Sequence, residues 1–167
     1  MEAIVIRRAT ESELEALRAI YNEGIEDRCA TLESEAKSAD DIALWWAEHD
    51  DRYVVLVARE GTSTIGWASL NRFSHRCAHA AIADLSVYIA RSHRGRGIGS
   101  LLLAEIESRA SEAGFHKIVL HALEENERGK RLYSKAGFTK VGVFREHGIL
   151  DGRFIDVLAM ERLLPAL

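Results

Sequence analysis

The chain contains 167 residues and carries 22 Lys and Arg against 26 Asp and Glu, a formal net charge of −4 at pH 7. This length suits one domain with a substantial core, and the negative balance argues against a dedicated nucleic-acid binder. No apolar run reaches membrane-spanning length, and the first residues lack the basic and apolar regions of a signal peptide. Cys29 and Cys77 have neither metal-ligand spacing nor the density of a disulfide scaffold. We therefore expect a single cytoplasmic domain over residues 1–167.

Strands and helices alternate along the chain, without a linker or an internal repeat. In chain order, we predict a strand over 3–8, a helix from 10 to about 22, a helix after 38, strands over 53–58, 64–70 and 82–89, a helix over 98–110, a strand over 118–122, a helix over 126–136, and strands over 138–145 and 153–162. Capping boxes at Thr10 and Ser38 open the first two helices, and Gly114 and Gly137 end the last two. The last two strands are expected to form a hairpin.

The most informative segment joins the strand over 82–89 to the helix over 98–110. Its basic and glycine residues are Arg91, Arg94, Gly95, Arg96, Gly97 and Gly99. Backbone N–H groups at a helix start have no intrahelical acceptor, and glycines let a phosphate approach the backbone closely. The segment therefore predicts a polyphosphate site, with a glycine-rich turn of no binding function as the alternative.

Two nucleotide-binding motifs fit this loop poorly. A phosphate-binding loop of the nucleotide hydrolases ends in Gly-Lys-Ser or Gly-Lys-Thr, whereas this loop ends in Gly97-Ile98-Gly99-Ser100. A dinucleotide fingerprint begins directly after the strand, and here Arg91 to Arg94 intervene. The pattern Arg94-x-x-Gly97-x-Gly99 instead resembles the acetyl-CoA pyrophosphate loop of the GNAT N-acyltransferase superfamily.

A second segment strengthens this resemblance. Asn126, Leu132-Tyr133 and Gly137-Phe138 match the Asn…Leu-Tyr…Gly-Phe pattern of the superfamily. Together the two motifs imply the GNAT fold over nearly the whole chain. That fold is an α/β (α+β) domain with a single mixed, mostly antiparallel central sheet and helices on both faces.

Three further segments resemble one branch of the superfamily, the phosphinothricin acetyltransferases and L-amino-acid N-acyltransferases. They are Ile20-Tyr21-Asn22 with the following residues 30–33, Asp84 to Ile89, and Asp151 to Val157. The branch implies that an N-acetyltransferase moves the acetyl group of acetyl-CoA to the primary amine of a small amino-acid-like acceptor, by direct attack in a ternary complex. Phosphinothricin, methionine sulfone and methionine sulfoximine are acceptors of this type. We also expect a homodimer, and no metal.

The resemblance implies two ways of holding acetyl-CoA. Backbone groups of Val87, Tyr88 and Ile89 would pair with the pantetheine arm like an added strand, and one N–H there would polarise the thioester carbonyl. Asn126 would hydrogen-bond the same arm, although the start of a helix also makes it a natural N-cap. The pyrophosphate would be bound by Arg94, Gly95, Arg96, Gly97, Ile98, Gly99 and Ser100.

Two side chains are expected to move protons. A free α-amino group has a pKa of about 8, so a base or a water chain must take its proton before attack. Asp84 lies where the branch usually has a glutamate. Because its side chain is one methylene shorter, it would act as the base through a bridging water. The alternative is that Asp84 only hydrogen-bonds a neighbouring strand end. Tyr133 occupies the position of a tyrosine acid in many GNAT enzymes and would protonate the leaving thiolate; alternatively it packs a helix against the sheet.

The loop before the central strand is expected to contact the acceptor. A carboxylate or phosphinate is matched by the guanidinium fork of arginine, and the loop supplies Arg72 and Arg76 beside Phe73 and His79. His79 and Ala81 stand where relatives have an aromatic residue and an arginine, which weighs against phosphinothricin itself. A solvated loop is the alternative for these residues.

Other functions fit less well. A protein N-terminus or a polyamine is the alternative acceptor, although the basic loop disfavours a polyamine electrostatically. His75, Cys77 and His79 have no second cluster to complete a metal site, and nothing places a base beside either cysteine for a covalent mechanism. A non-catalytic acyl-CoA-binding sensor would keep the pyrophosphate loop, but Asp84 and Tyr133 argue for catalysis.

Overall fold

A seven-stranded sheet forms the centre of the computed structural model, which describes residues 2–166. The strands are β1 (Ile4–Arg8), β2 (Val55–Glu60), β3 (Ser63–Arg72), β4 (Ile82–Ile89), β5 (Lys117–Leu123), β6 (Thr139–Leu150) and β7 (Arg153–Leu163), in the order β1-β2-β3-β4-β5-β7-β6. Among these strands only β4 and β5 run parallel, and all other neighbours are antiparallel. The predicted single, mixed, mostly antiparallel sheet is confirmed.

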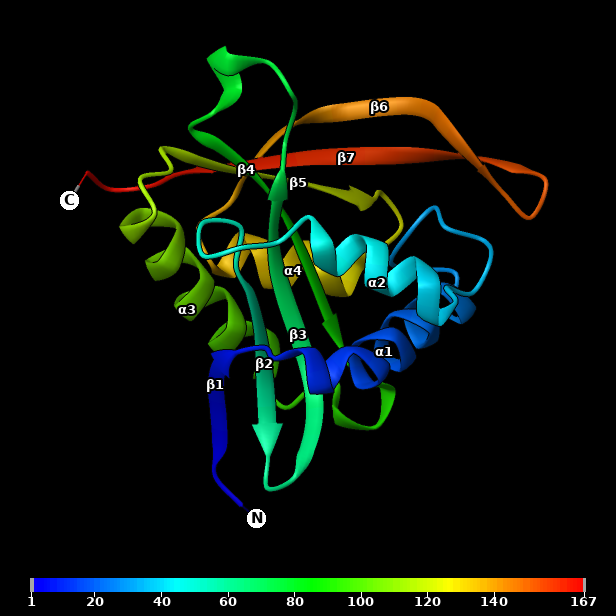
Figure 1. Ribbon diagram of the computed structural model, residues 1–167. Coiled ribbons are helices and arrows are strands. Elements are labelled where there is room, and N and C mark those ends of the chain that lie inside the picture. Colours follow the sequence, from blue (N-terminus) through cyan, green and yellow to red (C-terminus); the bar gives the residue numbers. More distant parts are fainter. Residues whose placement is uncertain (1, 167) are drawn as a thin grey trace.

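Helices cover both faces of this sheet (Figure 1). They are α1 (Leu14–Glu26), α2 (Ala39–Ala47), α3 (Ile98–Glu112) and α4 (Glu127–Lys135). The larger core lies under α3, where Leu102 and Ile106 are fully buried against the sheet, and the smaller core joins Leu17 of α1 to Trp67 of β3. In residues 2–166, no helix is both long enough and apolar enough to cross a membrane.

Two predicted boundaries are wrong. The first helix was expected to end near Asn22 but continues to Glu26. Glycine has a low helix propensity, and in this last turn the packing of Gly24 directly against the ring of Tyr88, where a Cβ would be only 3.0 Å away, offsets that cost. The strand expected over 138–145 continues to Leu150, since a register shift between Phe144 and Gly148 lets the hairpin absorb extra residues. Both differences depend on contacts between distant parts of the chain.

The parallel strands β4 and β5 separate soon after they meet. Their pairing runs only from Ile82, opposite Lys117, to Asp84, opposite Val119. Beyond Asp84, the edge of β4 that faces β5 has no strand partner among the described residues, while its other edge stays paired with β3. Unpaired backbone donors and acceptors of this kind are a template for an added strand. The opening between β4 and β5 carries the candidate site.

Candidate active site

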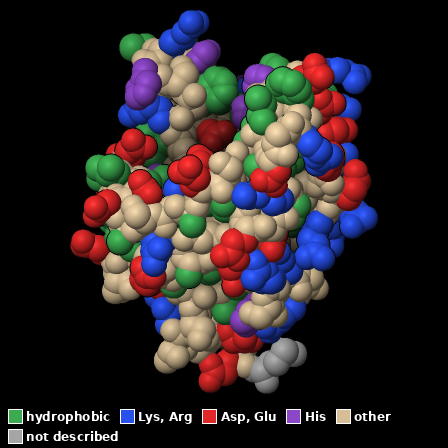
Figure 2. Space-filling view, turned by 90° about the vertical axis from the view of Figure 1, so that its right-hand side faces the viewer, with side chains coloured by type: hydrophobic (Ala, Val, Ile, Leu, Met, Phe, Trp, Pro, Cys, Tyr) green, Lys and Arg blue, Asp and Glu red, His purple; other side chains and the backbone are tan. Residues whose placement is uncertain are grey.

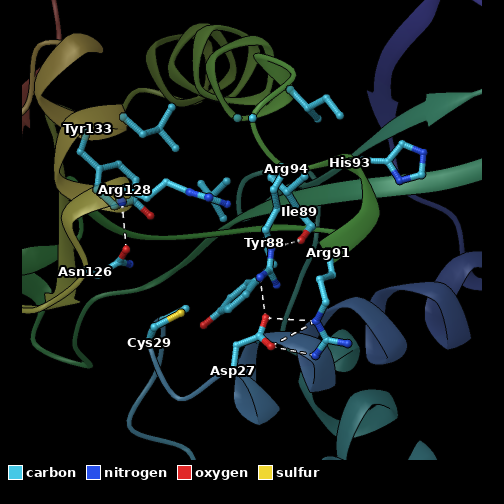
Figure 3. Close-up of a pocket in the computed structure, with 18 of the residues that line it drawn as sticks. Asp27, Cys29, Tyr88, Ile89, Arg91, His93, Arg94, Asn126, Arg128 and Tyr133 are labelled. Atoms are coloured by element: carbon cyan, nitrogen blue, oxygen red, sulfur yellow. Dashed lines mark hydrogen bonds and ion pairs between the residues drawn. The ribbon is translucent and has the colours of Figure 1, made fainter. Parts of the chain in front are cut away.

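A groove of about 660 Å³ runs from the opening of the sheet to the start of α3. Figure 3 shows Tyr88 and Ile89 on one side of it and Asn126 and Tyr133, from the start and body of α4, on the other. We call it the long groove. Ten of the eleven residues predicted to bind the cofactor line the long groove: Val87, Tyr88, Ile89, Arg94, Gly95, Gly97, Ile98, Gly99, Ser100 and Asn126. Arg96 is absent from this lining.

The glycines leave the start of α3 open. Gly97 caps the helix in the left-handed conformation with φ 80°, and a Cβ built on it meets no atom within 4 Å. The first hydrogen bond of the helix runs from the Leu101 N–H to the Gly97 carbonyl, at 3.3 Å, so the preceding N–H groups have no acceptor inside the helix. The Ile98 side chain is buried in the core, and this residue therefore offers only its backbone to the groove. This arrangement fits an anionic ligand.

Acidic side chains partly balance the arginines of the loop. Asp27 pairs with both Arg91, at 2.8 Å, and Arg94 (Figure 3). The hydrogen bond from Arg91 is the main cause that holds the pKa of Asp27 below its usual range. Arg96 pairs with Glu60 at 2.6 Å, outside the long groove. The positive potential is thus weaker than the sequence suggests, and an anion in the groove would compete with Asp27 for Arg94.

A smaller cavity of about 200 Å³ opens where β4 and β5 part, and we call it the central cavity. It brings together the two predicted proton-transfer residues, Asp84 of β4 and Tyr133 of α4. Val87, Tyr88 and Asn126 line both this cavity and the long groove, so the two spaces adjoin. Figure 2 shows the face with the α1–α2 connection and the β6–β7 tip. There, hydrophobic, histidine and acidic side chains gather around a hollow in the upper half.

The surroundings of Tyr133 fit both roles considered for it, packing of a helix against the sheet and proton donation. Its ring packs edge-on against Phe138, with 6.0 Å between ring centroids, and belongs to the margin of the larger core. Burial, and to a smaller degree the charge of Asp84, raise the pKa of Tyr133 to about 12. The phenol is therefore protonated throughout the neutral range and can donate a proton or hydrogen bond into the central cavity.

Two polar neighbours of Asp84 were not predicted from the sequence. His121 on β5 places Nδ1 3.8 Å from Asp84 Oδ1 and lines the central cavity. Asn71 on β3 places its amide nitrogen 3.4 Å from Asp84 Oδ2 and donates to Ser86 Oγ at 3.0 Å. A histidine inside the apolar run from Ile118 to Ala122 was a usable signal, because such a position needs a polar partner or solvent.

A pocket of about 310 Å³ lies on the α1 and α2 side of the sheet, and we call it the aromatic pocket. Its walls include Tyr21, Trp45, Trp67 and Tyr88, whose neighbouring rings lie 4.8 to 6.0 Å apart. Ser86 and Tyr88 line both this pocket and the central cavity. The central cavity therefore adjoins the long groove on one side and the aromatic pocket on the other.

The loop predicted to hold the acceptor does not gather at Asp84. Arg72 is exposed at the end of β3, and its guanidinium lies over the ring of Tyr53, 5.2 Å from the centroid, at the margin of the core on the α3 face. Phe73 and His79 contact each other at 5.2 Å between ring centroids. Arg76 is exposed at the start of a short helical turn, Cys77–His79. None of the four predicted residues lines the long groove, the central cavity or the aromatic pocket.

Comparison with known proteins identifies the class. Residues 14–138 match the model of the acetyltransferase (GNAT) family, so the chain belongs to this family and is an N-acetyltransferase. It is 30% identical over 165 residues to phosphinothricin N-acetyltransferase of Streptomyces coelicolor, with 96% of each chain covered. Such relatives place it in the phosphinothricin and L-amino-acid N-acyltransferase branch.

Two solved structures show the same fold. A phosphinothricin acetyltransferase of Sinorhizobium meliloti, in complex with acetyl-CoA, has a TM-score of 0.91 and 28% identity, covering 96% of this chain and 88% of that one. A ribosomal-protein-alanine N-acetyltransferase of Brucella melitensis has a TM-score of 0.92 and 33% identity, covering 96% and 99%. The predicted GNAT fold is therefore confirmed, while these two neighbours differ in the acceptor that their names give.

Proposed function

We propose that this chain transfers the acetyl group of acetyl-CoA to the primary amine of a small amino-acid-like acceptor, by direct attack in a ternary complex. The observation that carries the proposal is the central cavity, which holds Asp84 and Tyr133 and adjoins a separate space on each side. Two substrates can therefore reach it through different spaces, which have Tyr88 as a common wall. The named activity of the Streptomyces coelicolor relative supports an acceptor of this type.

The long groove is the proposed site of acetyl-CoA. The open N–H groups of Ile98, Gly99 and Ser100, with Arg94 beside them, would bind its pyrophosphate. The unpaired edge of β4 at residues 87–89 would hydrogen-bond the pantetheine arm. Asn126 uses its side-chain oxygen to cap α4, accepting the Gly129 N–H at 2.9 Å, which leaves its amide N–H groups for the same arm.

The chemistry requires a proton acceptor on one side of the thioester and a donor on the other. Asp84 supplies the negative charge that favours loss of the amine proton, acting through an intervening group because its side chain is short. Tyr133 donates to the sulfur of CoA as the carbon–sulfur bond breaks, since its raised pKa keeps the phenol protonated.

The aromatic pocket is the proposed site of the acceptor side chain. Its ring walls suit an apolar or sulfur-containing side chain, and its position beside Ser86 and Tyr88 leads directly to the central cavity. For the acceptor carboxylate we propose the guanidinium of Arg76, which is exposed and would have to reach the acceptor from outside the three spaces, since it lines none of them.

A panel of amines tests this proposal. Acetyl-CoA is supplied with free L-amino acids, methionine sulfone, methionine sulfoximine, phosphinothricin, polyamines and short peptides that begin with alanine, and released thiol is measured. We expect thiol release with one or more free amino acids or their sulfone and sulfoximine analogues. Release with alanine peptides alone would instead favour a protein N-terminus as acceptor, the activity named for the Brucella melitensis neighbour.

A further inference from the structure

We propose that the intervening group between Asp84 and the acceptor is the imidazole of His121, which takes the amine proton itself while Asp84 positions it. This inference rests on the proposed amine acetylation and names a residue for one of its steps. It starts from the 3.8 Å separation of His121 Nδ1 and Asp84 Oδ1 in the wall of the central cavity.

The fold explains why these two side chains meet. Asp84 is the last residue of β4 that pairs with β5, opposite Val119. His121 follows Val119 by two positions, so its side chain lies on the same face of β5. The two side chains therefore stand on neighbouring strands at the point where the sheet opens and a substrate can enter.

A polar network fixes the orientation of the Asp84 carboxylate. The amide nitrogen of Asn71 lies 3.4 Å from Oδ2 of Asp84, which leaves Oδ1 directed at His121. Asn71 is itself held, since its amide nitrogen donates to Ser86 Oγ and its oxygen accepts the Ser69 hydroxyl at 2.9 Å. The His49 ring contacts the same Asn71 oxygen at 2.9 Å.

The surroundings of His121 suit a proton acceptor. Its side chain is 41% exposed, and its ring packs beside Phe144 with 6.2 Å between centroids. With a proton on Nδ1 directed at Asp84, Nε2 keeps a free lone pair for the acceptor. The ionisable groups placed around it are Asp84 on β4, Tyr133 on α4 and, beyond Phe144, His147 on β6.

The proton balance closes with these residues. His121 Nε2 takes one proton from the acceptor ammonium, and the neutral nitrogen then forms its bond to the acetyl carbon. As the carbon–sulfur bond breaks, Tyr133 gives its phenol proton to the sulfur. The nitrogen then loses its second proton to the Tyr133 oxygen, which restores the phenol. The His121 imidazolium returns its proton to solvent, so amide, CoA thiol and one solvent proton are the products.

Chemical rescue tests the assignment. We expect His121→Ala to lower kcat/KM for the acceptor about 100-fold, within the range of general base catalysis. Added imidazole should then raise kcat/KM of the variant at least tenfold, because the vacated position is exposed and imidazole can enter it. His147→Ala is the matched control, since it removes a neighbouring imidazole stacked on Phe144, and it should keep its activity without imidazole dependence. Wild-type activity in His121→Ala, or lost activity that imidazole does not restore while CoA affinity is normal, would overturn the proposal.

A second readout needs no acceptor and so separates this inference from the proposed function. The ring nitrogens of His121 are followed by NMR in the wild type and in Asp84→Asn, to see which nitrogen of the neutral ring carries the proton. We expect the wild type to keep this proton on Nδ1, which faces Asp84, and the variant to lose that preference. The same tautomer balance in both proteins would refute the coupling of Asp84 and His121, whether or not an amino-acid acceptor is found.

Discussion

Tyr133 and Asp84 face the same cavity from α4 and β4, and the carboxylate charge adds to burial in raising the pKa of the phenol to about 12. A carboxylate and a protonated phenol thereby line one cavity. In the proposed reaction, this keeps Tyr133 protonated at the pH where the acceptor amine must lose a proton.

Tyr133→Phe should therefore lower kcat about 100-fold while leaving the Kd of acetyl-CoA nearly unchanged, because only proton donation to the sulfur is lost. The edge-on contact with Phe138 survives in phenylalanine, so thermal stability serves as the control. Rapid-quench measurement of the chemical step checks the prediction. A wild-type rate for that step would leave Tyr133 with a packing role alone.

The open start of α3 can be tested with two matched glycines. Gly97→Ala and Gly114→Ala impose the same strain, since both positions have φ 80° and open space around a built Cβ. Only Gly97 lies in the long groove. We expect calorimetry to show CoA binding weakened about tenfold or more in Gly97→Ala, through loss of charge-assisted hydrogen bonds, and unchanged in Gly114→Ala. Equal affinities in the two variants would exclude the loop as the pyrophosphate site.

Gly99 is a poorer choice for that experiment. It is buried, and a Cβ there would lie 2.9 Å from Leu132 Cδ2. A substitution would push α3 away from α4 and so change both walls of the groove. Loss of CoA binding in such a variant would not separate ligand contact from helix packing.

Arg76→Ala should chiefly raise the acceptor KM, whereas Arg72→Ala should not, because Arg72 is stacked on Tyr53. Loss of a charge-assisted bidentate pair costs about 1.5–3 kcal/mol, or roughly ten- to a hundred-and-fiftyfold in kcat/KM. Steady-state kinetics with an amino acid and its amide check the prediction, since the amide has no carboxylate to lose its partner. Equal losses on both acceptors would remove Arg76 from acceptor recognition.

The carboxylate of Glu13 predicts a pH-dependent contribution to stability. Burial raises its pKa, but hydrogen bonds from Arg7, the Thr10 backbone and Arg59 outweigh burial and lower it from 4.5 to about 2. A lowered folded-state pKa stabilises the fold above pH 4.5, and this contribution of about 3 kcal/mol is lost as the pH falls toward 2.

Urea unfolding between pH 6 and 2.5 measures that contribution. The wild type should lose stability more steeply below pH 4.5 than Glu13→Gln, which has no carboxylate to protonate. Parallel pH dependence in the two proteins would contradict the assignment to Glu13.

Short sequence motifs predicted the features that depend only on residues close together in the sequence. The glycine loop before α3 and the capping box at Ser38, whose hydroxyl accepts the Asp41 N–H at 3.1 Å, are of this kind. Both depend on the backbone N–H groups at a helix start, which Ser38 satisfies locally and which the glycine loop leaves open.

Side-chain directions across the sheet were not predictable in this way. Arg72 and Asn71 are adjacent, and the register that pairs Asn71 with Asp84 turns Arg72 to the opposite face. His121 reaches Asp84 only because β4 and β5 pair in parallel for three residues before they part. The length of α1 likewise depends on contact of Gly24 with Tyr88, far along the chain.

Acetyl transfer within a ternary complex of acetyl-CoA and a free amino acid is tested most directly by initial velocities with both substrates varied, together with mass spectrometry of the product. We predict intersecting double-reciprocal lines and an N-acetylated amino acid formed in equal amount to free CoA. CoA binding without transfer to any amine, or parallel lines that indicate an acetylated enzyme intermediate, would contradict the account.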